Sequence, residues 1–293
     1  MKTGKTAVAL LAAALALAPF GATGAMEWPL LDATVLRNFG FNDRGRPGLG
    51  VVLAGRGDAL AAAAGEVLFR FDPGAGGAAR FPSPLGAWIA VDHGNGLVSV
   101  YARLGGLAAE GGASVAAGDA IGVAGVSGAS GAEGGLFTLY DRRERRWVNP
   151  AMIAAPFPDA LAPRIYRVRL RGEDGSTVDV VPGQSVAQGR HAVLVEVSDD
   201  LSGGRGTGLA PHRVVVSVNG AEEGRLALET IVARDGVALA NRETPIPVGR
   251  VHGAFPAFEA AEAWLNRGQA IIEVVAWDVA GNSAVFVANV AVE

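Results

Sequence analysis

The sequence predicts a mostly β protein with two domains. Short apolar runs recur along the chain, and turn signals such as Asn95-Gly96 and Asn219-Gly220 separate them. The chain has 293 residues, of which 50% are hydrophobic and 18% charged. This composition is typical of a globular protein with a hydrophobic core, and the length leaves room for roughly two domains.

Residues 1–25 have the pattern of a Sec-type signal peptide. Lys2 and Lys5 precede an apolar run over residues 7–18, and Thr23-Gly24-Ala25 supplies small residues for cleavage after Ala25. An apolar run of about a dozen residues is too short to span a bilayer, although an uncleaved anchor is the alternative. We therefore expect a secreted or periplasmic protein with no stable membrane insertion after cleavage. The chain has no cysteine, which excludes a lipid-modified N-terminal cysteine and any disulfide.

The charge balance argues against two classes of partner. The formal net charge is −4, and Lys2 and Lys5, both in the leader-like segment, are the only lysines. The remaining chain is therefore more acidic still. Such a balance disfavours a nucleic-acid-binding surface and strong attraction to anionic lipid.

A stretch from Gly86 to Ser130 predicts short strands joined by tight turns. An apolar run at 88–91 leads into the turn 93–96, and 97–101 forms the return strand. Two further apolar steps, 114–115 and 120–123, flank Gly118-Asp119. The glycines lie where a small barrel has to turn corners.

This stretch resembles the core of the lysostaphin/LytM-type zinc endopeptidases (metallopeptidase family 23, the duplicated hybrid motif). The matching residues are His93-Gly94-Asn95-Gly96-Leu97, Tyr101-Ala102-Arg103-Leu104, Val115, Gly118, Ile121-Gly122, Gly125, Ser127-Gly128 and Val148-Asn149-Pro150. The resemblance implies a LytM-like β-barrel or sandwich. It also implies the activity of the family, which is zinc-dependent cleavage of peptidoglycan cross-bridges.

The positions that carry the family's chemistry do not match. Residues 46–69 align with its "H-x-G-x-D" segment, but Arg46 stands for the ligand histidine and Gly50 for the ligand aspartate. Arg103 replaces the catalytic histidine of "YAHL". The paired histidines of "HLH" align with Gly135 and Phe137, and no histidine occurs from Gly94 to Arg190.

A catalytic zinc site needs three protein ligands and an open position for water. Gly50 and Phe137 have no side-chain donor atoms, and His93 is not a zinc ligand in the family pattern. The sequence therefore predicts a pseudo-enzyme with no catalytic residues, no metal ligands and no cofactor. We expect a peptidoglycan-binding module, or a regulator that binds a cell-wall amidase or other hydrolase. Candidate binding residues along the former groove are Arg46, His93, Tyr101 and Arg103, although arginines on a solvated surface would look the same.

Two other functions remain for comparison. An active peptidoglycan metalloendopeptidase with a non-standard site would need ligands from elsewhere, and His191, His212 and His252 all fall in the second domain. A biotinyl or lipoyl carrier domain shares the glycine-valine pattern but needs a lysine to modify, and none follows Lys5.

The second half predicts a separate sandwich. We divide the chain into the leader at 1–25, a degenerate LytM domain at 26–153, a proline-rich linker at 154–163 and an immunoglobulin-like β-sandwich at 164–293. The segment 278–283 resembles the "D-x-x-GN" hairpin of bacterial immunoglobulin-like domains. One short helix is expected over 257–267. Asp199, Asp200 and Asp278 are calcium-ligand candidates, but capping of turns explains these aspartates equally well and is favoured.

Overall fold

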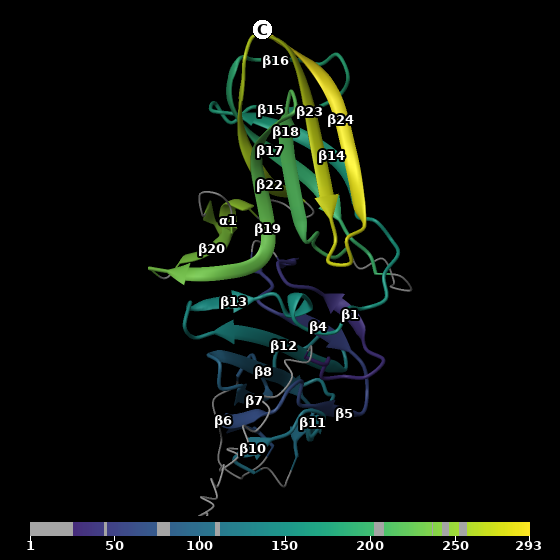
Figure 1. Ribbon diagram of the computed structural model, residues 1–293, viewed down its shortest axis with the longest axis vertical. Coiled ribbons are helices and arrows are strands. Elements are labelled where there is room, and N and C mark those ends of the chain that lie inside the picture. The colour runs from purple at the N-terminus through teal and green to yellow at the C-terminus, as the bar shows by residue number, and fades with distance from the viewer. Residues whose placement is uncertain are drawn as a thin grey trace, which may run out of the picture.

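The computed structural model describes residues 26–43, 46–74, 83–108, 112–201, 208–235, 237–241, 246–251 and 257–293. The regular secondary structure of these residues is almost entirely β-strand (Figure 1), which confirms the predicted fold class. Among them, no helix has the length and apolar character needed to cross a bilayer. Residues 1–25 lie outside the described residues, so the signal peptide stays a prediction.

The first half of the chain forms the lower part of the molecule in Figure 1. Its elements are Thr34–Arg37 (β1), Asn42–Asp43 (β2), Arg46–Pro47 (β3), Val51–Ala54 (β4), Asp58–Leu60 (β5), Gly65–Phe71 (β6), Ala87–Asp92 (β7), Leu97–Leu104 (β8), Gly106–Leu107 (β9), Ser114–Val115 (β10), Ala120–Val123 (β11), Gly134–Asp141 (β12), Arg146–Val148 (β13) and a 3₁₀ turn at Pro150–Met152 (η1).

The second half forms the upper part. Its elements are Arg164–Gly172 (β14), Thr177–Asp179 (β15), Ser185–Val186 (β16), Gly189–Ser198 (β17), Arg213–Val218 (β18), Ala221–Arg234 (β19), Val237–Asn241 (β20), Ile246–Pro247 (β21), Val248–Val251 (α1), Ala257–Leu265 (β22), Gly268–Trp277 (β23) and Ser283–Val292 (β24).

The lower half is built on one sheet with a small sheet beside it. Strands run in the order β10-β6-β7-β8-β12, with β4 and β1 continuing from β12, and β5-β11-β9 form the small sheet. The predicted hairpin is confirmed, because β7 and β8 pair across the turn 93–96. There the positive φ falls on Gly94 and Gly96, which adopt it without steric cost.

The upper half is a sandwich of two sheets. One contains β15-β14-β17-β22, and the other contains β19-β18-β23-β24-β16. Asn219 and Gly220 both have positive φ in the turn between β18 and β19, as a tight Asn-Gly hairpin requires. The helix expected over 257–267 is wrong, because β22 occupies Ala257–Leu265 and pairs with β17. Most of β22 is buried, and a short buried apolar run does not reveal its period.

A shared strand joins the two halves. The long strand β19 bends out of the upper sandwich and pairs with β13 of the lower sheet (Figure 1), with Trp147 opposite Ile231. Each of the two hydrophobic cores also includes a residue from the other half of the chain. Phe39 from the first half packs in the upper core, and Leu209 from the second half packs in the lower core.

Two asparagine side chains add polar contacts at this junction. The Asn38 amide donates to the Ala210 carbonyl oxygen at 2.7 Å and accepts from the Ala210 N–H at 2.9 Å. Asn149 donates from its side chain to Leu228 O at 3.0 Å. Each amide pairs with backbone groups of the other half in the way a neighbouring strand would. The halves therefore pack as one body along this junction, while the predicted domain boundaries stay a prediction.

Candidate functional site

The aligned metal position at Gly50 lies directly before β4 and against β12. A Cβ atom placed on Gly50 would come within 2.3 Å of the Phe137 carbonyl oxygen and 2.5 Å of Thr138 Oγ1. Contacts this short do not occur in folded proteins, so β12 would have to move to admit any side chain at Gly50. Arg46 lies in β3, opposite Asp43 of β2, and its side chain is outside the described residues.

Phe137, at the second metal position, is part of an aromatic cluster. Its side chain is 0% exposed. The ring centroid lies 5.2 Å from that of Tyr101 and 6.0 Å from that of Trp28. Trp28 in turn stacks on Phe157 at 4.5 Å and donates from Nε1 to the Ala155 carbonyl oxygen at 2.6 Å. Chain segments before and after the lower sheet thus cover this position with aromatic side chains.

These residues do not fit a zinc ion. Zinc needs imidazole, thiolate or carboxylate donors, and neither Gly50 nor Phe137 supplies one. A neighbouring ligand cannot enter at Gly50 without a backbone clash, and Phe137 is packed on all sides. We therefore derive no reaction step through a metal at this place.

Tyr101 does not line an accessible groove, contrary to the expectation from sequence. Its side chain is 1% exposed, and its hydroxyl oxygen accepts the Ala62 N–H at 2.8 Å. Burial raises the pKa of the Tyr101 hydroxyl above its usual value, because the apolar surroundings disfavour the phenolate. The family motif at Tyr101 therefore serves packing and hydrogen bonding in this fold.

The other two candidates, His93 and Arg103, lie at opposite ends of β8. The backbone N–H of His93 donates to Leu97 O, where the strand begins, and Arg103 lies near its end. Arg103 lies six residues after Leu97 along the strand, which is roughly 20 Å at the usual rise per residue. The structure therefore does not bring His93 and Arg103 into one groove.

His93 has two structural contacts. Its Nδ1 lies 2.8 Å from Ala64 O, and its Nε2 lies 2.9 Å from the hydroxyl of Ser99. Because a carbonyl oxygen only accepts, Nδ1 carries a proton and donates to Ala64. The ring thus ties the β7–β8 turn to the chain that leads into β6.

The backbone of Arg103 lies near an open depression, which Arg103 itself does not line. Its φ is +62°, and its backbone N–H donates to Leu85 O at 2.7 Å. Gly86, the next residue after Leu85, lines a depression of about 500 Å³ together with Pro73, Ser83, Pro84, Gly128 and Ala129. Of the four candidate groove residues, Arg103 is the one whose described surroundings include such a space.

The Ser127-Gly128 motif beside this depression stabilises the fold. Ser127 Oγ accepts the Ala87 N–H at 2.9 Å and donates to Leu104 O at 2.5 Å. Ser127 thus links the first residue of β7 and the last residue of β8 to the chain segment after β11. The motif residues Tyr101 and Ser127 therefore make structural contacts in the lower half, whereas Gly50 and Phe137 at the aligned metal positions have no donor atoms.

The histidines of the second half do not form a site in the part that the structure describes. His191 is buried in β17 and contacts Ala187 O through Nε2 at 2.8 Å. The partly buried His212 lies 3.9 Å from Glu229, and burial lowers the pKa of His212. His252 lies outside the described residues.

Within the described ranges, one group of three potential metal ligands comes together, and it is not at the aligned zinc position. Asp159, Asp199 and Asp278 each place an oxygen within 4.8 Å of the others. Asp199 follows β17, Asp278 follows β23, and Asp159 belongs to the predicted linker. Asp200, a candidate from sequence, is not part of this trio, and its Oδ1 accepts the Gly208 N–H at 3.1 Å.

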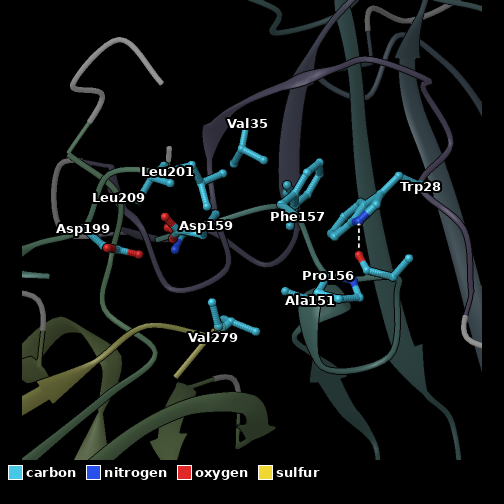
Figure 2. Close-up of a pocket in the computed structure, with 14 residues that line it drawn as sticks. Trp28, Val35, Ala151, Pro156, Phe157, Asp159, Asp199, Leu201, Leu209 and Val279 are labelled. Atoms are coloured by element: carbon cyan, nitrogen blue, oxygen red, sulfur yellow. Dashed lines mark hydrogen bonds between the residues drawn. The ribbon is translucent and has the colours of Figure 1, made fainter. Parts of the chain in front are cut away.

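The trio lies deep at the junction of the two halves. Asp199 is 5% exposed and Asp278 3%. Burial, and then the neighbouring charges of Asp278 and Asp159, raise the pKa of Asp199 to about 7. Asp159 and Asp199 also line a mostly apolar pocket of about 60 Å³ with Trp28 and Phe157, among others, as Figure 2 shows.

Sequence reasoning missed Asp159 because no local pattern connects it with the other two. It lies about 40 residues from Asp199 along the chain and reads as an ordinary linker residue. The one signal was its place in a proline-rich segment that had to pass from one sheet system to the next.

Comparison with protein families agrees with the lower fold. Residues 46–150 match the model of peptidase family M23, and a second, separate family model covers residues 162–293. Residues 46–150 therefore form a peptidase M23 domain of the LytM type. No curated protein sequence matches the chain.

Several solved structures are similar to parts of the chain. A chain of the SpoIIQ–SpoIIIAH pore-forming complex is 21% identical, with 45% of this chain and 92% of that chain covered and a TM-score of 0.36. The catalytic domain of the M23 protein EnpA from Enterococcus faecalis is 20% identical, with coverages of 44% and 96% and a TM-score of 0.35. Lysostaphin is 14% identical, with coverages of 75% and 87% and a TM-score of 0.37.

Proposed function

We propose that this protein is a catalytically degenerate M23 protein of the cell envelope that acts by binding. One observation carries the proposal, namely that the metal positions at Gly50 and Phe137 hold residues without donor atoms in closely packed surroundings. Without its ligands, an M23 domain has no means to lower the pKa of an attacking water.

The family motif residues that this chain contains stabilise the fold of the lower half. Tyr101 and Ser127 both retain hydrogen bonds that close the lower sheet. The ligand in this proposal is a peptidoglycan fragment, or a cell-wall amidase or other hydrolase that the domain regulates.

Arg103 is the residue that we assign to recognition, with Arg46 as a second candidate. A guanidinium group stays charged at all physiological pH values and pairs well with a carboxylate. Stem peptides of peptidoglycan carry carboxylates, and so does the surface of any protein partner. The open depression beside Gly86 is the space in which such a group would approach Arg103.

The proposed location is outside the cytoplasm, in the periplasm or beyond the cell. It rests on the signal-peptide pattern of residues 1–25 and on the usual location of M23 substrates.

The deciding experiment measures zinc content, hydrolysis and binding on one preparation. After incubation with zinc and dialysis, we expect a zinc stoichiometry near zero and no cleavage of purified muropeptides. Cleavage that a chelator abolishes would instead establish an active metalloendopeptidase with a non-standard site.

Binding is tested with the same muropeptides and with a purified amidase. Arg103→Gln is expected to weaken the interaction by roughly tenfold, the effect of losing one charge-assisted hydrogen bond. The matched control is Arg56→Gln, which removes a highly exposed arginine paired with Glu133. Equal binding by both variants and the unmodified protein would remove Arg103 from the proposal.

A further inference from the structure

We propose that Asp159, Asp199 and Asp278 bind a calcium ion at the junction of the two halves. The inference is independent of the proposed function, because it concerns a different place in the molecule and a different chemistry. Through Asp159, the bound ion would hold the proline-rich segment that connects the halves in a fixed position.

The geometry of the three carboxylates fits one shared cation. Oxygen ligands lie about 2.4 Å from calcium, so two ligands of one ion are at most about 4.8 Å apart. The three aspartate oxygens all lie within 4.8 Å of one another. Figure 2 shows the carboxylates of Asp159 and Asp199 lying next to each other at one end of the pocket.

Asp199 supplies a second, independent observation. Its side chain is 95% buried, and its Oδ1 atom has no hydrogen-bond partner among the described residues. A buried carboxylate oxygen without a donor costs free energy unless a cation or a proton compensates it. The Asp199 carboxylate lies beside the other two carboxylates, where a cation would contact all three.

Asp278 is held in place by its own hairpin. The Asn282 backbone N–H donates to Asp278 Oδ1, and the Asn282 amide donates to Asp278 Oδ2, both at 2.8 Å. The same amide lies 3.4 Å from the backbone carbonyl oxygen of Asp159. Asn282 therefore fixes the position of two of the three ligand residues, and the turn-capping role of Asp278 is compatible with metal binding.

The donor set selects the class of metal. Three carboxylates and no nitrogen or sulfur ligand favour a hard divalent cation. Calcium tolerates irregular geometry and takes six to eight oxygen ligands, whereas magnesium requires a near-ideal octahedron. The adjoining pocket of about 60 Å³ has room for the water molecules that would complete a calcium shell.

Among the described residues, no arginine or histidine forms an ion pair with Asp199 or Asp278. The raised pKa of Asp199 agrees with this lack of compensation, since its charged form is disfavoured in the metal-free protein. A bound dication would reverse that preference.

The test uses the purified protein after chelator treatment. We expect calcium binding by titration calorimetry, with one site per chain. At a concentration 100-fold above Kd, calcium should raise Tm by roughly 5–10 °C, given the usual sensitivity of chains of this size. Calcium is added up to about 10 mM, which covers the range of extracellular calcium modules.

Asp199→Asn and Asp278→Asn should each weaken calcium binding at least tenfold and remove most of the Tm shift. The matched control is Asp58→Asn, which changes an exposed aspartate of β5 and should keep the full shift. Asp199→Asn is isosteric and removes a buried charge, so we expect it to fold and to be no less stable than the unmodified protein in chelator.

Three results would overturn the proposal. The first is no heat of binding and no Tm shift with calcium, which would mean that the carboxyl groups share a proton instead. The second is a shift that survives in both Asp199→Asn and Asp278→Asn, which would place the ion elsewhere. The third is an equal shift with magnesium at the same concentration, which would contradict the calcium assignment.

Discussion

The aligned zinc position and the carboxylate trio differ in the chemistry of their residues and in whether a sequence motif locates them. Gly50 and Phe137 are located by a motif, and they are apolar and closely packed. No single motif spans the trio, although Asp278 lies in a hairpin motif, and its three buried or half-buried acids come from three separate segments. The difference teaches that a motif preserves the place of a site more reliably than its chemistry. It also teaches that a new polar site can arise where independent segments meet.

The largest effect is expected from restoring the family's aspartate at Gly50. In Gly50→Asp the new Cβ would lie 2.3 Å from Phe137 O, so β12 must shift or the protein must unfold. We expect a loss of more than about 3 kcal/mol in the free energy of unfolding, measured by urea denaturation, and no gain of zinc.

Gly131→Asp is the matched control for this substitution, because nothing lies within 4 Å of a Cβ at Gly131. It should change stability by less than about 0.5 kcal/mol. A Gly50→Asp protein that kept full stability and bound zinc would reverse our view of the first site.

The junction can be weakened without touching any carboxylate. Asn38→Ala removes both hydrogen bonds to the backbone of Ala210, which is buried. Two buried backbone groups then lose their partner, and we expect a loss of about 2–3 kcal/mol in urea denaturation. If the junction is one body, unfolding should remain a single transition.

The exposed Asn289→Ala in β24 is the control for Asn38→Ala and should have little effect. Two separate transitions in the Asn38→Ala protein, with one in the control, would show that the halves unfold independently.

A smaller effect with a pH signature is expected at Tyr101. Tyr101→Phe leaves the buried Ala62 N–H without its acceptor and should cost about 1–2 kcal/mol at neutral pH. Because burial raises the pKa of Tyr101 in the folded state, the unfolded chain loses the phenolic proton first as pH rises. The unmodified protein therefore loses stability above about pH 10, and the phenylalanine variant lacks this contribution.

The measurement is the difference in unfolding free energy between the two proteins at pH 7 and near pH 10.5. This difference should shrink at the higher pH. A constant difference would mean that Tyr101 titrates normally and that its surroundings are wetter than the structure indicates.

The sequence was informative wherever a local rule applied. The Asn219-Gly220 turn needs only two residues with positive φ, and the hairpin between β7 and β8 needs only alternation and a glycine turn. It was misleading at β22, where alanines and phenylalanine fit a helical face as well as a buried strand.

Long-range contacts were beyond local rules. Nothing in the sequence of β19 shows that its C-terminal half pairs with β13, or that Phe39 crosses into the upper core. For the candidate site, the motif located Gly50 and Phe137, and their residue types excluded zinc ligands there. The burial of Tyr101 and the position of Asp159 beside Asp199 depend on tertiary packing, which the motif does not describe.

The bend in β19 also has a mechanical consequence. A single strand belongs to the sandwich at one end and to the M23 sheet at the other, so tension applied between the two ends of the molecule passes along a continuous backbone. A hinge would let each end turn freely, whereas here the pairs from Arg146–Val232 to Val148–Thr230 must break before the ends can swivel. These strand pairs therefore resist rotation of one half of the molecule against the other.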